Sequence, residues 1–372
     1  MMQDRRAFLA LAGAGMAAPL IARTLPRDPI AGKIVVNALG GLADPNIEGE
    51  AEDPFSTRVL ADARASGVTA INCTFGYVAG ADDPFEKSVR DVARYDALLR
   101  RHSDALLKAL SVADIRRAKA ENKVGIIYGF QNGAMMGSDA SRVDIFADMG
   151  VRVFQLTYNP PNQLGDGSMA PLNRGLTPFG REVVARLNQR RMMVDLSHSG
   201  QQTCLDAARA STAPISINHT GCRAVTDLPR NKTDEELRLV VSRGGFVGIY
   251  FMPFLDPHGH AHASDVVAHI DHAVNVCGED HVGIGTDGTI SQIDDLGAYA
   301  AALARENASR RAAGIAAAGE GPDTYPFVVD LRGPDQFRKL ARLLVDRGYT
   351  ARQIDKILGL NFLRFAGEVW GE

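Results

Sequence analysis

Apolar residues recur along the chain in short runs rich in β-branched side chains, separated by longer stretches of mixed polarity. Runs that are apolar almost throughout, such as VGIIYGF at residues 124–130, are typical of strands covered on both faces. Eight such runs can be counted: Lys33 to Asn37, Thr69 to Thr74, Val124 to Phe130, Val151 to Tyr158, Met192 to His198, Pro214 to His219, Gly244 to Phe251 and His281 to Asp287.

The stretches between these runs carry apolar residues at helical spacing. They predict helices over Phe179 to Arg190, Gln201 to Ala210, Asp234 to Ser242 and Asp265 to Cys277. Strands alternating with helices favour an α/β fold, a closed (β/α)₈ barrel of the TIM type. An open doubly wound sheet is the alternative, but ALGGLAD after the first strand lacks the G-x-G-x-x-G form of a phosphate-binding turn.

The end of the chain adds two further predicted helices, Asp335 to Arg347 and Ala351 to Phe365. Before them, the Gly-rich and Ala-rich stretch Ala313 to Gly321 is predicted to be a mobile surface loop. No internal repeat or linker divides the sequence, so we expect a single barrel domain over residues 27–372.

The first residues differ from the rest. Arg5 and Arg6 precede Phe8-Leu9 and an apolar stretch that runs to about Ile21. This order is typical of a twin-arginine export signal, and we expect a signal peptide over residues 1–26 and a periplasmic or otherwise exported protein. The alternative is a fortuitous basic N-terminus before a short helix.

Composition excludes some classes of partner. The 41 Lys and Arg residues are offset by 44 Asp and Glu residues, so the net charge of -3 gives no basic field for nucleic acid. No later stretch has the roughly 18 apolar residues that a membrane span needs. The 4 cysteines form no C-x-x-C pair, which argues against a disulfide framework or a thiolate zinc site. A single disulfide after export stays open.

Polar residues end several of the predicted strands, where a barrel of this type carries its active site. His198 ends VDLSH, His219 ends ISINH and Asp287 ends GIGTD. Two neutral imidazoles on neighbouring strands can converge on one cation, and a carboxylate at the same mouth can bind metal or accept a proton. The alternative is that each histidine is a hydrogen-bonded core residue.

Two other features could supply metal ligands. Cys73, near the end of the second strand, could offer a thiolate, although a free cysteine more often behaves as a small buried apolar residue. His258, His260 and His262 alternate after the seventh strand. Such a run in a loop is more often solvated.

Several segments resemble the membrane (renal) dipeptidase family of metallopeptidases, in order along the chain. They are VRVFQLTYN, GLTPFGREVVARLNQRRMMVDLSHSG, APISINHT, DLPRNKTDEEL, GGFVGIYF, HVGIGTD and KILGLNFLR. The resemblance covers most of the chain after the predicted signal. It implies a (β/α)₈ barrel that binds two zinc ions and hydrolyses dipeptides.

The resemblance also implies roles for individual residues. His198 and His219 match the histidines of the second zinc, and Asp287 matches an acidic residue that handles the proton or the substrate amine. Arg230, in LPRN, matches the arginine that meets the substrate carboxylate, a role suited to a forked guanidinium. Without the resemblance, Arg230 would be interpreted as a surface loop arginine.

The sequence departs from the family at the first zinc. The family pattern D-G-H-N-D aligns with Asn37-Ala38-Leu39-Gly40-Gly41, so Leu39 and Gly41 replace a histidine and an aspartate. The bridging glutamate aligns with Gln131, and the strand-four histidine aligns with Tyr158. We therefore expect Gln131 and Tyr158 to contact substrate rather than metal.

These losses favour one zinc ion over two. Two Zn²⁺ would bring four positive charges into a partly desolvated pocket where, of the family's acidic groups, only Asp287 remains. One zinc held by His198, His219 and a contribution from Asp287 leaves an open position for water.

The resulting hypothesis is an exported dipeptidase-like metallohydrolase that cleaves dipeptides or small amides with zinc-activated water. The first alternative is a divergent family member acting on another amide or peptide-derived metabolite. The second is a catalytically inactive binding protein that captures a small amino-acid derivative. The expected partner is a small dipeptide-like molecule, and a homodimer stays open.

Overall fold

The strands of this protein form one sheet that curls into a barrel, as a computed structural model covering residues 28–49 and 51–371 shows. Neighbouring strands pair in parallel in the order β1-β2-β4-β5-β6-β7-β8-β9. The strands are β1 Val36–Gly40, β2 Ala70–Thr74, β3 Leu106–Lys108, β4 Val124–Phe130, β5 Val151–Gln155, β6 Met193–Asp195, β7 Ser216–Thr220, β8 Phe246–Ile249 and β9 Val282–Ile284.

The two ends of this strand order meet and close the barrel. Gly41, just after β1, forms a parallel bridge with Thr289 beyond β9. The Gly41 N–H donates to the Gly288 carbonyl at 3.0 Å, and the Asp287 N–H donates to the Leu39 carbonyl at 2.9 Å. The predicted (β/α)₈ fold class is therefore confirmed.

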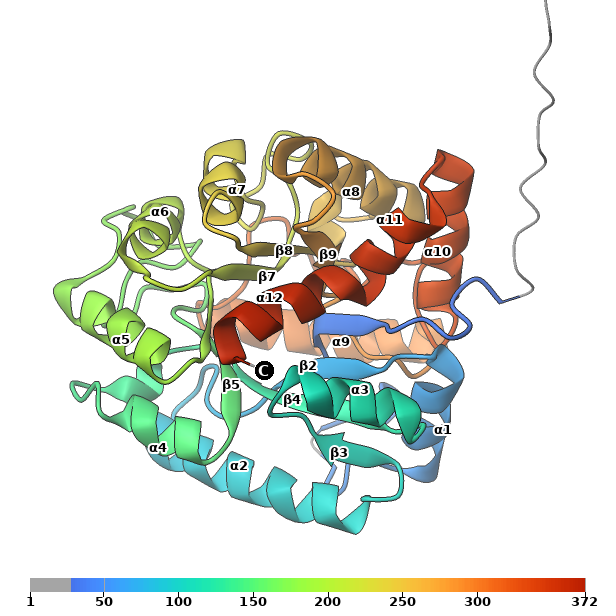
Figure 1. The fold of residues 1–372 in the computed structure, drawn as a ribbon, viewed down its shortest axis with the longest axis horizontal. Helices are drawn as coiled ribbons and strands as arrows, with labels where there is room; N and C mark the ends of the chain where they lie inside the picture. The colour runs from blue at the N-terminus through green and yellow to red at the C-terminus, as the bar shows by residue number, and fades with distance from the viewer. Residues whose placement is uncertain (1–27, 50, 372) are drawn as a thin grey trace, which may run out of the picture.

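Figure 1 shows helices around the barrel and across one of its mouths. They are α1 Thr57–Ser66, α2 Pro84–Arg101, α3 Val112–Ala120, α4 Arg142–Asp148, α5 Pro178–Gln189, α6 Gln201–Ala210, α7 Asp234–Val241, α8 Ala263–Cys277, α9 Leu296–Ala312, α10 Gln336–Arg347, α11 Ala351–Asp355 and α12 Asn361–Trp370. The helices predicted between the later strands correspond to α5, α6, α7 and α8.

One end of the barrel is closed by α12, which crosses the near mouth in Figure 1. Phe362 and Phe365 pack on Phe246, which belongs to a cluster with Val36 and Ile127 from other strands. These residues lie toward the N-terminal ends of the strands. The opposite, C-terminal mouth is the one left for chemistry.

The predicted helix Ala351 to Phe365 is divided in the structure. A π-helical turn, Lys356–Leu360, separates α11 from α12. Gly359 lies within this turn, and a Cβ there would come 2.5 Å from the Ile34 carbonyl oxygen. The wider turn therefore lets the helix backbone approach the start of the barrel closely, a tertiary effect that helical periodicity does not report.

The elements that the sequence did not predict include β3 and α9. β3 pairs with the first half of β4 beside the barrel order, and its three residues are too few to give a pattern. The longer α9 was missed because only Leu303 and Asn307 of its residues are buried, so it lacks an apolar stripe. The predicted loop Ala313 to Gly321 follows α9 directly. It is not simply exposed, since the Ile315 carbonyl accepts from Asn159 Nδ2 and Ala317 is buried.

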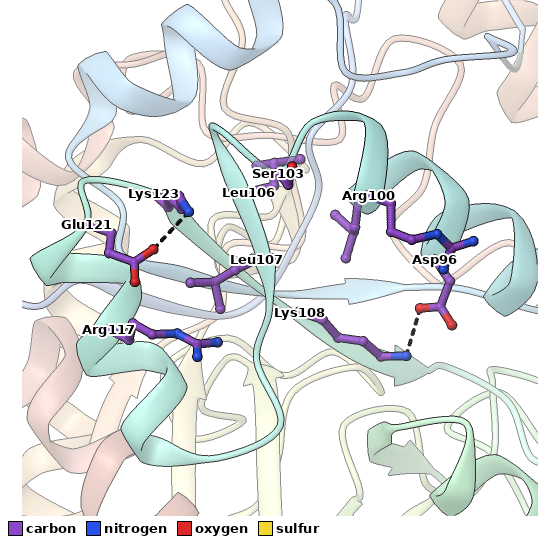
Figure 2. Close-up of a pocket in the computed structure, with 10 residues that line it drawn as sticks. Asp96, Arg100, Ser103, Leu106, Leu107, Lys108, Arg117, Glu121 and Lys123 are labelled. Atoms are coloured by element: carbon purple, nitrogen blue, oxygen red, sulfur yellow. Dashed lines mark hydrogen bonds and ion pairs between the residues drawn. The ribbon is translucent and has the colours of Figure 1, made fainter.

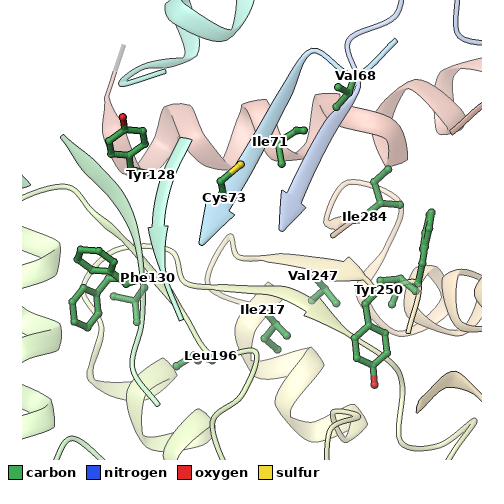
Figure 3. Close-up of a cluster of buried hydrophobic side chains, with 14 of the residues drawn as sticks. Val68, Ile71, Cys73, Tyr128, Phe130, Leu196, Ile217, Val247, Tyr250 and Ile284 are labelled. Atoms are coloured by element: carbon green, nitrogen blue, oxygen red, sulfur yellow. The ribbon is translucent and has the colours of Figure 1, made fainter. Parts of the chain in front are cut away.

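A hydrophobic core fills the space between barrel and helices (Figure 3). Ile71, Ile217 and Ile284 project into it from three strands. Cys73 lies in the same core, and burial raises the pKa of its thiol to about 12. The favoured interpretation of Cys73 as a small buried apolar residue is therefore supported over the thiolate alternative, because its side chain faces the apolar layer. All 4 cysteines lie in the described part of the chain and are free. The single disulfide considered as an alternative is therefore not formed there.

Residues 1–27 are outside the described residues, and the predicted twin-arginine signal falls there. The boundary between signal and barrel at residues 26 and 27 stays a prediction. Within the described helices, none combines the length and apolar character needed to cross a membrane.

Candidate metal centre and substrate cavity

Three predicted residues meet at the C-terminal mouth of the barrel. His198 follows β6, His219 lies on β7 and Asp287 follows β9. One ligand atom from each lies within 4.8 Å of the other two. The imidazole rings of His198 and His219 have centroids 4.9 Å apart. The convergence expected from neighbouring strand ends is therefore present.

One ring nitrogen of His198 forms a hydrogen bond, and the other is available to a ligand. Its Nδ1 lies 2.7 Å from Asn159 Oδ1, an acceptor, so Nδ1 carries the proton and Nε2 keeps its lone pair. Nε2 is buried and has no hydrogen-bond partner among the described residues. Burial lowers the pKa of His198 well below its usual value. A neutral imidazole with a free lone pair is the form that binds a metal ion.

His219 is completely buried between two carboxylates. Its Nε2 lies 3.9 Å from Asp287 Oδ2, and its Nδ1 lies 4.0 Å from Asp195 Oδ2. Burial lowers the pKa of His219 well below its usual value, so this ring is also neutral. Asp195 is itself fixed, because its Oδ1 accepts from the backbone N–H groups of Ser197 and Asn218. The sequence motif DLSH contained Asp195, but its role beside a ligand was missed.

Asp287 adopts a backbone conformation that is rare for a residue with a side chain. Its φ is +57°, in the left-handed region, and its N–H donates to the Leu39 carbonyl. Burial raises the pKa of Asp287 to about 6, although the charges of Arg230 and Arg310 oppose that rise. Strained residues of this kind concentrate at functional sites. The turn aims the carboxylate at His219 while leaving part of it accessible.

The donor set fits one divalent metal ion. Two imidazole nitrogens and one carboxylate are three ligands, which leaves a fourth position of a tetrahedral zinc site open. The partnerless, buried Nε2 of His198 supports this assignment, since a buried polar atom needs a partner. For a second ion, the side chains of Leu39 and Gly41 offer no donor atoms. Gln131 contributes a neutral amide whose Nε2 lies 3.5 Å from His219 Nε2.

Arg230 lies in the same site and is only 2% exposed. Its Nη1 donates to the Ser197 carbonyl, while Nη2 is buried without a partner among the described residues. Its guanidinium carbon lies 5.9 Å from the centre of the Tyr250 ring. The interpretation of Arg230 as a surface loop arginine is wrong. A buried guanidinium with an unused donor can bind a substrate carboxylate.

A cavity of about 180 Å³ joins these groups. His198, Arg230 and Asp287 line it on the barrel side, together with Tyr158. The Tyr158 ring stacks on His198, with centroids 4.3 Å apart and planes inclined by 24°. Gln131 contacts His219 but does not line this cavity. Its side chain also hydrogen-bonds Asp287, which does line the cavity, and its contact with substrate stays a prediction.

The outer wall of the cavity comes from α9, which the sequence did not predict, and from the predicted loop that follows it. Arg310 of α9 and Glu320 both line the cavity and pair through Nε–Oε1 at 2.7 Å and Nη2–Oε2 at 3.2 Å. Asn307 donates to the Gly321 carbonyl at 2.9 Å and fixes the segment to α9. No sequence signal marked Arg310, because it belongs to a helix without an apolar stripe.

The alternating histidines lie apart from this site. His262 caps α8 and its Nδ1 lies 3.5 Å from Asp330, while His260 lies 4.0 Å from Asp323. Both side chains are more than half exposed. Among the residues that the structure describes, His198, His219 and Asp287 are the one group of three that could hold a metal. The interpretation of the run as solvated is supported.

A larger hollow of about 540 Å³ lies around β3 (Figure 2). Lys108 pairs with Asp96, and Lys123 pairs with Glu121, each at 2.8 Å. Since β3 pairs with the first half of β4, this hollow lies toward the N-terminal ends of the strands. Barrel enzymes carry their chemistry at the other end, so the hollow is not the candidate site.

Comparison with known proteins agrees with this geometry. The profile of the membrane dipeptidase family, Peptidase family M19, matches residues 63–305. The chain belongs to this family. The matched residues include His198, His219, Arg230 and Asp287.

Individual relatives are similar over most of the chain. Dipeptidase tcpJ of Claviceps purpurea is 29% identical over 308 residues, which cover 80% of this chain but only 64% of that protein. The structure of an amidohydrolase from Pseudomonas aeruginosa is 31% identical, covers 92% of this chain and 98% of the other, and superposes with a TM-score of 0.79. A metallopeptidase from Rhodobacter sphaeroides, bound to a phosphinate mimic of the dipeptide L-Ala-D-Ala, shares the fold at 20% identity, covers 91% of this chain and 100% of the other, and has a TM-score of 0.72.

Proposed function

We propose that this protein is an exported metallohydrolase that cleaves dipeptides or small amides with a single zinc ion. One observation carries the proposal. Two members of the three-ligand cluster, His198 and Asp287, line the same small cavity as a buried arginine, Arg230, that has an unused donor. Membership of the dipeptidase family and the named activities of its relatives support the choice of substrate.

His198 and His219 would hold the ion, with Asp287 completing the ligand set. A bound zinc ion supplies Lewis acidity for the scissile carbonyl and makes water a better nucleophile at neutral pH. Asp195 and Asn159 keep the two imidazoles oriented, as the outer partners of metal ligands commonly do.

Side chains of the protein perform the remaining steps. The Asp287 carboxylate accepts a proton from water as the water oxygen bonds to the carbonyl carbon, and returns that proton to the leaving amine as the C–N bond breaks. Arg230 binds the free carboxylate of the substrate through Nη2 and so fixes which bond lies beside the ion. Tyr158 stacks on His198 and limits the space next to it.

The protein would act outside the cytoplasm if the predicted signal in residues 1–26 directs its export. A homodimer stays a prediction. A signal assignment can be tested by expressing the full chain and locating the protein after cell fractionation. A variant with Arg5 and Arg6 both changed to Lys should stay in the cytoplasm, because the pair is the recognised element of the signal.

Metal analysis tests the proposed function most directly. We expect about one zinc per chain in the purified protein and hydrolysis of a dipeptide panel. His198→Ala should lose both zinc and turnover, because it removes one of only three ligands. His258→Ala, which changes an exposed histidine of the alternating run, should keep both. Wild-type protein that holds no stoichiometric zinc, and that added zinc does not activate, would contradict the proposal.

The same wild-type and variant proteins distinguish this proposal from two alternatives. The replacement of family residues by Tyr158 and Gln131 favours a divergent substrate. This alternative would be supported if the zinc-containing protein hydrolysed another amide but cleaved no dipeptide. An inactive binding protein would keep its affinity for an amino-acid derivative in His198→Ala. A metallohydrolase should lose metal and turnover together.

A further inference from the structure

A chain of three side chains connects the outer wall of the cavity to the metal centre. Glu320 holds the Arg310 guanidinium through Nε and Nη2. Arg310 in turn hydrogen-bonds the hydroxyl group of Tyr158. The Tyr158 ring stacks on His198, a ligand of the proposed metal. Glu320, Arg310 and Tyr158 all line the cavity.

The direction of these hydrogen bonds leaves one donor unused. A guanidinium has five N–H donors and no acceptor, so Arg310 donates and the Tyr158 oxygen accepts. The phenolic proton of Tyr158 is therefore available to another acceptor. A phenol keeps its proton at neutral pH, because its ordinary pKa is about 10.

The position of Tyr158 decides what that acceptor is. Tyr158 is 8% exposed, and one face of its ring stacks on His198, whose Nε2 would bind the metal ion. A substrate carbonyl polarised beside His198 would thus lie next to the phenol. Donors placed where negative charge develops on an attacked carbonyl oxygen are among the strongest contributions to catalysis.

We infer that Tyr158 is a catalytic hydrogen-bond donor to the carbonyl oxygen of the substrate, and that Arg310, held by Glu320, is the positioning residue that orients it. This inference rests on the proposed function and deepens it. It assigns a role to α9 and the segment up to Glu320, which close the cavity opposite the metal ligands. Arg310 and Glu320 neutralise each other, so the chain orients the phenol without adding net charge.

Tyr158→Phe tests the donor while keeping the stacked ring. We expect kcat to fall by about 100-fold with little change in KM, because the lost bond forms mainly as charge develops. The zinc content should stay at the wild-type level, since Tyr158 is not a ligand. Arg311→Gln changes the next residue of α9, which is exposed, and should leave kcat unchanged.

A double-mutant cycle tests the positioning role of Arg310. Arg310→Gln alone should lower kcat, and adding Tyr158→Phe should cost little more, because both changes remove the same oriented donor. A purely structural role would make the two losses multiply. Glu320→Gln provides a milder variant if Arg310→Gln folds poorly.

Binding gives a readout that does not need turnover. Calorimetry with a phosphinate dipeptide mimic should show at least a 10-fold weaker Kd in Tyr158→Phe, while the affinity for the product amino acid stays unchanged. Wild-type kcat and phosphinate affinity in Tyr158→Phe would overturn the inference and leave the proposed function intact. A wild-type protein that neither hydrolyses dipeptides nor binds the mimic would overturn both.

Discussion

At the scale of single residues, the site depends on groups that are buried with one bonding position unused. His198 offers Nε2 and Arg230 offers Nη2, and each is fixed elsewhere by a bond to Asn159 or to the Ser197 carbonyl. Unpaired buried polar atoms are costly, so their presence in one cavity indicates ligands that complete them. The strained turn at Asp287 belongs to the same constellation.

Arg230→Lys tests the carboxylate contact at this scale. The lysine keeps the positive charge but loses the forked geometry, so kcat/KM for dipeptides should fall by about 10- to 100-fold. Dipeptide amides, which lack the carboxylate, should change much less, and kinetics with both substrates measure the difference. Arg223→Lys, an arginine paired with Asp227 at the surface, is the control. An equal loss for both substrate types would show that Arg230 acts through structure alone.

At the scale of elements, α12 matters because it fills one end of the barrel. Phe362 is 1% exposed and meets the rings of Phe246 and Trp370 edge to face. The apolar stripe of this helix was visible in the sequence as a helical pattern, but its partner inside the barrel was not. Closing the N-terminal mouth leaves the C-terminal mouth, where His198 and His219 lie, as the accessible one.

Phe362→Ala should lower the free energy of unfolding by about 3 to 5 kcal/mol, because it leaves a cavity at the base of the barrel. The shift of the urea midpoint, with the slope checked for change, measures this loss. Leu360→Ala is the matched control, since Leu360 is 44% exposed and should change stability little. Equal effects of the two variants would contradict the assigned packing of α12.

At the scale of the whole molecule, stability should depend on pH through a buried histidine outside the active site. His269 of α8 accepts from the Cys222 N–H through Nδ1 at 2.8 Å and donates to the Leu255 carbonyl from Nε2 at 3.1 Å. This pair of bonds requires the neutral ring. Burial lowers the pKa of His269 to about 4, and His272 opposes protonation while Asp265 favours it.

Because the folded state binds this proton less readily than the unfolded chain, the stability from His269 is complete above pH 6.5 and is lost as the pH falls toward 4. The loss amounts to about 3 kcal/mol over the window, at about 1.4 kcal/mol per unit of pKa. His269→Gln should be less stable at pH 7.5 but lose less on acidification, as urea unfolding across this range can show. His258→Gln should follow the wild type. If the free energy of unfolding of His269→Gln fell with pH as steeply as that of the wild type, the role of His269 would be contradicted.

The barrel and its C-terminal mouth could be predicted from the sequence because both follow from local patterns. Apolar runs identified the main strands, and polar residues at their ends pointed to His198, His219 and Asp287. The predicted strands ran past the observed ends of β5, β6, β8 and β9, since residues after the last paired one, such as Leu156 and Leu196, are still buried. Cys73 was ambiguous because alternation alone does not say which side faces the helices.

The sequence by itself determined the order of strands and helices and the donor types at the strand ends, because these depend on periodicity and on side-chain chemistry. Only the tertiary structure decided that Arg230 is buried, that Asp195 and Asn159 orient the two imidazoles, and that Arg310 reaches Tyr158. Those contacts join residues far apart in the sequence, some on a helix with no apolar stripe. Their geometry exists only once the closed barrel brings the strand ends and α9 around one cavity.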